Sequence, residues 1–495
     1  MKIKMLLILG ILFGNYFHSP GQENIRYYSL REIIRISKEQ SPDALIARQT
    51  FRSSYWDFRS YQASNLPALI LTSTLPNINQ SVSSQTYNGV QSYQSNKGIS
   101  GQANLALEQK IGITGGTVSM NSSLDYQYNA NQPDSIPQTP FLSNPINIVL
   151  NQPIFTYNSF RWDRKIKPLK YSIAKRKYLE DIEQISITAT NYFFNLMQAQ
   201  VEKKISLTNL SNYDTLYRIA KGRYQLGKIA ENDLLQLELS FLKAQAQVEN
   251  ANLALDNAQF QFKSYLRLQD TTRIVLVPPA DVKFFKIDPD KAVGLALENS
   301  STSLDFKKRM LEGASSLNQA KTEGRFDANI YAKIGLNKTA ATVPDAYRAP
   351  GDVRQVSLGL TIPIVDWGVA RGRINMAQSQ MEIIKNAVEQ DSIDFQQNVY
   401  LKVIQFNMQQ NQLMIAAKSD TVARKSYEVT KGRYLIGKIN SILDLNNAQM
   451  ETDNSEKNYY FALQTFWRSY FEIRKLTLYD FQNDKPIEFN LKDFK

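Results

Sequence analysis

The chain repeats one of its own segments at a constant offset of 210 residues. Residues 221–229 have the sequence KGRYQLGKI, and residues 431–439 have the sequence KGRYLIGKI. The same offset aligns residues 152–155 (QPIF) with residues 362–365 (IPIV), about 70 positions upstream. Two matches that share one offset predict a duplication in which the element between them is present in both copies without insertions.

Long helices are predicted by apolar residues that recur at alternating steps of four and three. This seam is almost continuous from residue 185 to residue 224 and unbroken from residue 234 to residue 265. Such seams are typical of coiled coils. In each copy we expect an opening helix of about 35 residues (29–63 and 290–323), then strands, a helix of about 60 to 70 residues, a short turn and a returning helix of about 35.

Shorter segments alternate between apolar and polar residues, which predicts strands. Every second residue of 356–364 is aliphatic, and the residues between them are small, polar or proline. Residues 118–128, 146–154 and 330–336 follow a similar pattern. One aliphatic and one polar face are typical of a strand between lipid and water. Half of a soluble sandwich gives the same alternation, so the strands alone leave both interpretations open.

The N-terminus predicts export from the cytoplasm. Lys2 and Lys4 precede an apolar run over residues 5–17, and small residues at Ser19 and Gly21 offer a cleavage position. This arrangement is a secretory signal peptide over residues 1–21, because the apolar run is too short to span a bilayer as a helix.

Composition excludes several classes of protein. The chain has no cysteine, and its only histidine, His18, lies in the expected signal peptide. Disulfides, thiolate metal sites and histidine-based catalysis are therefore excluded from the mature chain. We expect no cofactor, no metal site, no catalytic residues and no enzymatic activity. The net charge of +12 favours anionic lipid headgroups or acidic partners, and an exported protein has no nucleic-acid partner.

Together these features resemble the TolC-like outer-membrane efflux protein family over nearly the whole mature chain. The resemblance is carried by the doubled Arg-Tyr-x-x-Gly-Lys-Ile turns, by the strand ends at Pro153 and Pro363, and by the order of strands and long helices in each copy. It implies a mixed α+β membrane protein with two structural repeats per chain. Three chains share a transmembrane β-barrel, which a long α-helical coiled-coil tunnel continues into the periplasm of a Gram-negative bacterium.

The resemblance implies that the protein is the outer-membrane exit duct of a tripartite efflux or type I secretion system, exporting small molecules or proteins. The partners implied are a homotrimer, a periplasmic adaptor (membrane fusion) protein, an inner-membrane pump reached through the adaptor, and outer-membrane lipid. A soluble periplasmic coiled-coil scaffold would explain the helices without the strands. A porin-like passive channel would explain the strands and leave the helices without a role.

The repeats and the resemblance together predict five segments. These are a signal peptide (1–21), a first repeat (22–269), an inter-repeat linker or equatorial region (270–290), a second repeat (291–476) and a polar C-terminal tail (477–495). Between its opening helix and its proline-ended strand, the first repeat has about 49 residues more than the second. These residues predict an extra barrel hairpin or an external plug, so that twelve and eighteen strands are both possible.

By resemblance, the helical turns lie at a periplasmic aperture. Asp233 has the family's spacing for an aperture acid, and Asp444 and Asn447 are its counterparts in the second repeat. Tyr434 matches an aromatic residue that locks helices together. In a trimer, six carboxylates would surround a narrow passage and favour cations. Both acids are equally suited to the first turn of a returning helix, where a carboxylate is stabilising.

Two further features of these turns follow from the resemblance. The second repeat lacks an arginine that some family members use as a latch, and Lys438 or Asn440 stands in its place. The turns themselves resemble the surface that adaptor proteins bind; they comprise Leu226, Gly227 and Lys228 in the first repeat and Ile436, Gly437 and Lys438 in the second. A glycine that only ends a helix explains either turn alone, and recurrence in both repeats favours docking.

The junctions between strands and long helices carry cations and tryptophans. Residues 161–177 contain eight lysines and arginines and one acid before residue 180, Asp163. This cluster is suited to lipid headgroups, or it is a solvated helix face. Trp162 and Trp367 flank the junctions and are suited either to an interfacial aromatic belt or to a packed corner.

Overall fold

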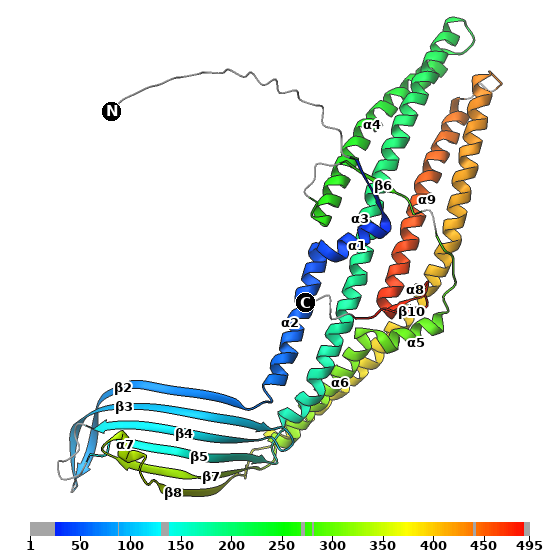
Figure 1. Ribbon diagram of the computed structural model, residues 1–495. Coiled ribbons are helices and arrows are strands. Elements are labelled where there is room, and N and C mark those ends of the chain that lie inside the picture. Colours follow the sequence, from blue (N-terminus) through cyan, green and yellow to red (C-terminus); the bar gives the residue numbers. More distant parts are fainter. Residues whose placement is uncertain are drawn as a thin grey trace, which may run out of the picture.

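The protein is elongated, with a curved sheet at one end and the turns of two long helical hairpins at the other (Figure 1). This computed structural model describes residues 25–87, 89–129, 138–268, 273–279, 282–438 and 442–489. The expected signal peptide and Asn440 lie outside these residues. None of the helices in the described part of the chain has both the length and the apolar character needed to cross a membrane.

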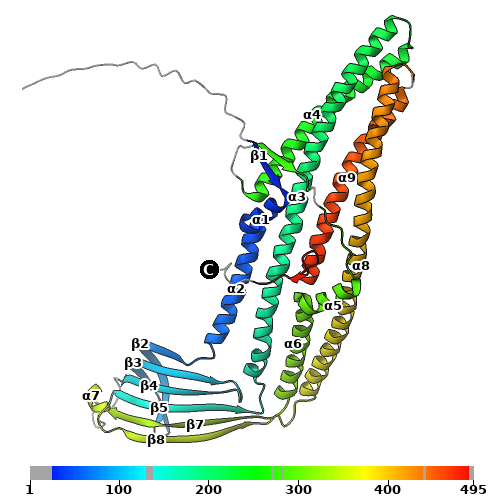
Figure 2. The same ribbon diagram turned by 45° about the vertical axis from the view of Figure 1, so that its right-hand side comes forward.

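Four long helices form the two hairpins. Helices α3 (Ser159–Gln225) and α8 (Val369–Leu435) each have 67 residues, and the returning helices α4 (Glu231–Leu266) and α9 (Ile442–Thr477) each have 36. These lengths agree with the expectation from the heptad pattern. The bounds of α3 and α8 keep the offset of 210, whereas α9 begins one position later because its turn is one residue longer. Helix α3 packs against α4, α8 against α9, and α3 against α9 (Figure 2).

The expectation of one continuous opening helix in each repeat was wrong. The first repeat opens with α1 (Leu30–Gln40) and α2 (Pro42–Ala63), and the second with α5 (Pro289–Asn299) and α6 (Ser301–Glu323). An extended serine separates the helices of each pair, and its hydroxyl accepts a hydrogen bond from the third backbone N–H of the next helix. Such a serine cap competes with a continuous helix, and in the first repeat the proline after it adds to the break.

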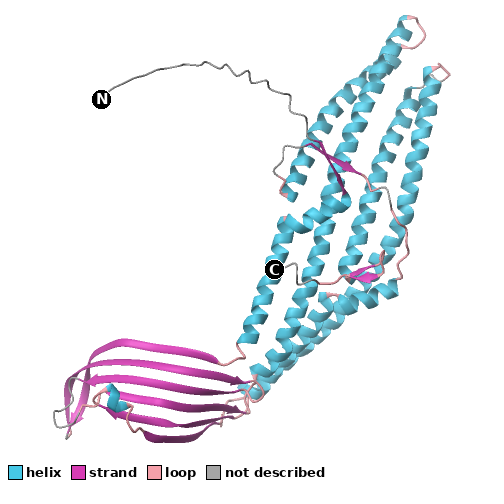
Figure 3. Cartoon of the chain, in the orientation of Figure 1, coloured by secondary structure: helices cyan, strands magenta, loops and turns pink. Residues whose placement is uncertain are grey.

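Six antiparallel strands form one sheet, in the order β2-β3-β4-β5-β7-β8 (Figure 3). Their bounds are β2 Ala68–Tyr87, β3 Val90–Ile111, β4 Gly116–Asn129, β5 Phe141–Ile154, β7 Asp327–Ala340 and β8 Gly351–Thr361. The extra residues of the first repeat form the β2–β3 hairpin, which adds two strands to this sheet. The pairing of β5 with β7 joins the two repeats, and a short helix, α7 (Val343–Ala346), lies between β7 and β8.

Short strands and a large core lie around the middle of the helices. Strand β1 (Ile25–Ser29) pairs in parallel with β6 (Arg273–Val277), and β9 (Tyr479–Asp480) pairs with β10 (Lys485–Pro486). The core beside them joins α1, α3, α4, α5, α8 and α9. Its largest fully buried side chains are aromatic: Phe193, Phe194, Phe262, Phe406 and Phe466. Burial of large rings here provides most of the apolar stabilisation that holds the repeats together.

A buried ion-pair network joins α3, α9 and the C-terminal tail. The side chain of Glu183 is 1% exposed and accepts from Arg474, whose Nε lies 2.9 Å from Glu183 Oε2. Arg474 Nη1 also lies 2.6 Å from Asp480 Oδ2, and Lys38 Nζ lies 3.3 Å from Glu183 Oε1. Burial lowers the pKa of the Arg474 guanidinium, and the Glu183 carboxylate more than offsets this effect, so that the net shift is upward.

Replacing Glu183 by alanine is expected to destabilise the protein by about 3–5 kcal/mol, because the buried Arg474 then loses a counter-ion. The measurement is the thermal unfolding midpoint of the protein in detergent micelles. Glu39→Ala is the matched control, since Glu39 pairs with Arg35 on an exposed face of α1, where an ion pair contributes little. Equal unfolding midpoints for the two variants would contradict this role of Glu183.

Candidate functional site

The two ends of the molecule carry the residues of interest: the faces of the sheet at one end and the hairpin tips at the other (Figure 3). On one face of the sheet, aliphatic residues stand opposite one another across five strands. This row runs from Leu69 through Leu107, Met120 and Ile148 to Ile334. Directly paired residues of neighbouring strands lie on the same face. All five side chains are exposed, so the strands form a continuous uncovered aliphatic surface.

The opposite face of the sheet is largely polar. One row across it is formed by Lys110, Thr117, Asn151, Tyr331 and Ser357. A second row, parallel to the first, contains Glu108, Ser119, Val149, Lys333 and Gln355. The sheet therefore separates an apolar surface from a surface that can hydrogen-bond water. Within the described residues, β2 and β8 each pair along one side only, which leaves both outer edges of the sheet open.

The two helical turns at the other end share one geometry. Gly227 and Gly437 adopt positive φ angles of 67° and 75°, which glycine accommodates without strain. The N–H of each glycine donates to the carbonyl three residues earlier, and the N–H of each following lysine donates to the carbonyl five residues earlier. This is the Schellman arrangement that ends a helix. It explains both glycines locally and leaves the turn side chains to project outward.

The hairpin tips contact each other through a small core of their own. It combines Leu216, Ala220 and Leu237 of the first hairpin with Tyr427, Tyr434, Ile442 and Leu445 of the second. Tyr434 is 2% exposed, as expected for a residue that locks helices together. Polar contacts surround this core. Lys431 Nζ donates to Asn212 Oδ1 at 2.9 Å, and the Tyr213 hydroxyl donates to Asn446 Oδ1 at 3.1 Å.

Arg223 joins the last turn of α3 to the last turn of α8. Its guanidinium donates to the carbonyl of Leu435 at 3.0 Å and to that of Tyr434 at 3.5 Å, and it lies 5.5 Å from the centre of the Tyr434 ring. A cation is favourable there because the carbonyls at a helix C-terminus carry partial negative charge. The sequence analysis sought a latch in the second repeat and missed Arg223, although the motif contains this arginine in both copies.

The candidate acids lie in the first turns of the returning helices. Asp233 is half-buried in α4, and Asp444 and Asn447 are exposed in α9. The N-cap residue of α4 is Ala230, so Asp233 does not occupy the cap position and acts on the helix only through its charge. Burial raises the pKa of Tyr434, Arg223 lowers it and Asp233 raises it further. The structure thus brings Asp233, Arg223 and Tyr434 together.

The remaining turn residues face solvent. Leu226 is 72% exposed and Ile436 is 66% exposed, and Lys228 and Lys438 are exposed beside them. Each hairpin tip therefore presents one aliphatic side chain and one lysine. Lys438 forms no contact comparable to that of Arg223 among the described interactions, so the latch position expected for it is filled from the first repeat.

The basic cluster at the start of α3 is largely engaged within the protein. Lys167 pairs with Asp57 at 3.3 Å, Lys170 pairs with Glu312 at 2.9 Å, and Arg176 donates to carbonyls at the end of α5. These contacts indicate a helix face that holds α2, α5 and α6. They leave fewer cations for lipid headgroups than the sequence pattern indicates.

The two junction tryptophans differ. Trp162 Nε1 donates to Asn318 Oδ1 of α6 at 3.4 Å, which places it in a packed corner. Trp367 is 94% exposed and has a φ angle of 53° at the junction between β8 and α8. The interfacial aromatic belt stays a prediction, and Trp367 fits it better. In the described part of the chain, no three carboxylates or imidazoles gather closely enough to hold a metal ion.

Comparison with known families decides the identity of this architecture. The model of the outer membrane efflux proteins matches residues 117–266 and 329–477, one block in each repeat. The chain belongs to the outer membrane efflux protein family. This confirms the resemblance to TolC-like proteins that the sequence motifs indicated. Proteins of this family are transport proteins of the outer membrane and not enzymes.

Solved structures share the fold of this efflux protein. The CmeC outer membrane channel of Campylobacter jejuni is 15% identical, with a TM-score of 0.64 over 94% of this chain and 89% of that chain. VceC of Vibrio cholerae is 12% identical, with a TM-score of 0.61 over 93% and 97%. The open state of MtrE of Neisseria gonorrhoeae is 12% identical, with a TM-score of 0.59 over 93% and 90%. The comparison with curated proteins gives no match.

Replacing Arg223 of this efflux protein by alanine is expected to weaken the contact between the tips by about 1.5–3 kcal/mol, because a charged donor is lost from the end of α8. Hydrogen exchange of the backbone amides of residues 442–445 should then become roughly tenfold faster or more. Arg218→Ala is the control, since Arg218 lies five residues earlier on α3 and pairs with Asp214 at the surface. Unchanged exchange in the Arg223 variant would disprove the latch.

Proposed function

We propose that this outer membrane efflux protein is the exit duct of a tripartite efflux or type I secretion system, through which small molecules or proteins reach the exterior. The observation that supports this most is the sheet, whose aliphatic and polar faces stand at one end of two locked helical hairpins. A sheet of this kind suits a wall between lipid and water. The long helices then extend into the periplasm of a Gram-negative bacterium.

Three copies of the chain form the working channel in this proposal. The open edge of β8 pairs with the open edge of β2 in the next copy, and closure removes every exposed edge. Because each chain supplies six strands, three chains give a barrel of eighteen strands. The flanks of the hairpins support the same assembly, since α4 and α8 each expose a row of large aliphatic and aromatic side chains, among them Leu239, Leu253, Phe260, Ile383, Ile404 and Ile415.

The hairpin tips form the periplasmic aperture and the docking surface in this proposal. The exposed Leu226 and Ile436, each followed by a glycine turn and a lysine, offer a periplasmic adaptor protein one repeated contact. The adaptor connects the duct to an inner-membrane pump. The contact of Arg223 with α8 supports a closed resting state, because it holds the two tips of one chain together.

The sheet and the helices weigh differently against the alternative functions. A soluble scaffold would have to cover the aliphatic row of the sheet, and within the described residues nothing covers it. A porin-like passive channel has no use for helices of 67 residues that are locked at their tips. The exit duct uses both ends of the molecule.

Replacing Ile148 by arginine is expected to reduce the amount of assembled protein in the outer membrane. A charge on the lipid face of a barrel costs about 2–4 kcal/mol near the middle of the bilayer. Asn151→Arg is the matched control, because Asn151 lies three residues further on the same strand and on the opposite, polar face. The measurement is the quantity of trimer extracted from membranes by detergent. Similar losses in both variants would refute the assignment of the two faces.

The double variant Asp233→Ala, Asp444→Ala is expected to lose preference for cations over anions, because six carboxylates leave the aperture of the trimer. The measurement is the reversal potential of single channels in a planar bilayer under a salt gradient. Asn447→Ala serves as the control, since it removes a neutral side chain from the same turn of α9. An unchanged reversal potential in the double variant would show that neither acid governs selectivity.

A further inference from the structure

The groove between α2 and α3 is filled by the C-terminal tail of the same chain. Phe489 lies with its ring centre 4.9 Å from that of Phe51 and 5.9 Å from that of Tyr178. Lys175 Nζ lies 6.0 Å from the centre of the Phe489 ring, in a cation–π arrangement. The tail thus closes the first repeat with one aromatic side chain and one lysine beside it.

The second repeat has the equivalent groove between α6 and α8. The offset of 210 relates α8 to α3, and an offset of 259 relates the caps and lengths of α5 and α6 to those of α1 and α2. Through these offsets, Ala47, Phe51 and Tyr178 of the first groove correspond to Phe306, Met310 and Val388 of the second.

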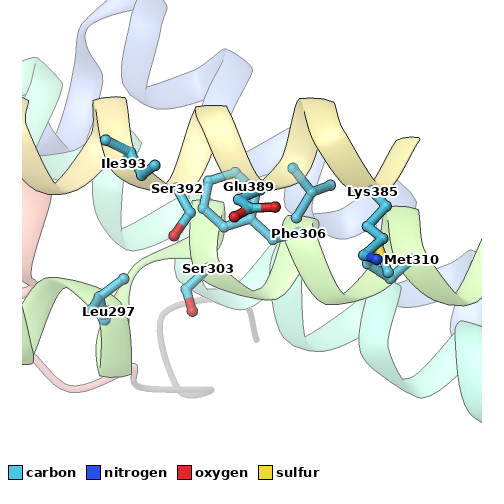
Figure 4. Close-up of a pocket in the computed structure, with 9 residues that line it drawn as sticks. Leu297, Ser303, Phe306, Met310, Lys385, Glu389, Ser392 and Ile393 are labelled. Carbon is cyan, nitrogen blue, oxygen red and sulfur yellow. The ribbon is translucent and has the colours of Figure 1, made fainter. Parts of the chain in front are cut away.

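In the second repeat this groove is an open cavity of about 540 Å³ (Figure 4). Phe306, Met310 and Val388 line it and remain half-buried. Lys385, which corresponds to Lys175, stands exposed at its rim. The second groove therefore keeps the apolar floor and the lysine of the first, and it lacks the aromatic side chain that fills the first.

We propose that the groove between α6 and α8 binds the last six residues, 490–495, of a neighbouring copy of this chain, with Phe494 in the position that Phe489 takes in the first groove. The inference rests on the trimer of the proposed function and adds the contact that seals each junction between copies. Three tails then close three grooves, so that every groove of the ring holds one phenylalanine.

The arrangement of the helices directs the tail toward a neighbouring copy. Helices α2, α3, α6 and α8 stand in a row, with α2 at one flank and α8 at the other (Figure 2). Asp484 of the tail pairs with Lys291 of α5 at 3.3 Å, and five residues later Phe489 lies between α2 and α3. The tail therefore runs away from its own α6–α8 groove and toward the flank that faces α8 of the next copy in a closed ring.

The length and charge of residues 490–495 fit this destination. Two helix spacings of 8–10 Å separate the two grooves across a junction between copies, which is about 18 Å. The five residues from Phe489 to Phe494 span about 17 Å when extended, and the phenylalanine side chain adds to this reach. Asp493 and the terminal carboxylate flank Phe494 in the sequence, and Lys385 is the cation at the rim that complements them.

Cysteine crosslinking tests this contact against a background without native cysteines. One chain carries Phe494→Cys and another, with a different affinity tag, carries Met310→Cys. The two are produced together, extracted as trimers and oxidised. We expect more than half of the Phe494→Cys chains that adjoin a Met310→Cys chain to become disulfide-linked to it. Asn386→Cys replaces Met310→Cys in the control, because Asn386 is exposed on the side of α8 opposite Val388, and it should give at least tenfold less product.

Two further measurements separate the possible outcomes. A chain carrying both Phe494→Cys and Met310→Cys should give linked oligomers, and a link confined to single chains would overturn the assignment to a neighbour. The mass of the protein in detergent before oxidation reports the trimer independently. An intact trimer without the crosslink overturns this inference alone, whereas a monomer overturns the trimer on which it and the proposed function both rest.

Discussion

The packing of α3 against α9 holds the two hairpins side by side, and the rest of the molecule depends on it. Polar pairs set the register of this contact at several heights: Gln198 with Gln464, Lys457 with Glu202, and Asn209 with Asp453. Because the register is fixed, the tips meet closely enough for Arg223 to reach the end of α8. At the other end the same register brings β5 beside β7, so that one sheet crosses both repeats.

The sequence predicted the features that depend on local periodicity. Heptad spacing gave the long helices close to their observed lengths, and alternation identified the strands of the sheet, because both patterns repeat within a few residues. The break at Ser300 was missed, since a serine cap without a following proline is a weak signal. The contact of Arg223 with α8 was also missed, because sequence alone does not show which of two duplicated arginines finds a partner more than 200 residues away.

Duplication gave this efflux protein two similar halves that have since diverged where their neighbours differ. The turns keep the same Schellman geometry, yet the second is one residue longer, so the two tips of a chain are not equivalent. The grooves diverged further. Ala47 leaves room for Phe489 in the first repeat, whereas Phe306 occupies the matching position in the second. Each half therefore makes contacts that the other cannot replace.

The pairing of β5 with β7 also has a consequence for the order of folding. These strands are adjacent in the sheet, but both helices of the first hairpin lie between them in the chain. After export of the first repeat, β5 keeps an open edge until residues 327–340 arrive. Closing so long a loop is entropically costly and slow, and an open strand edge is prone to aggregation meanwhile. The nascent chain thus passes through a stage in which it depends on periplasmic chaperones.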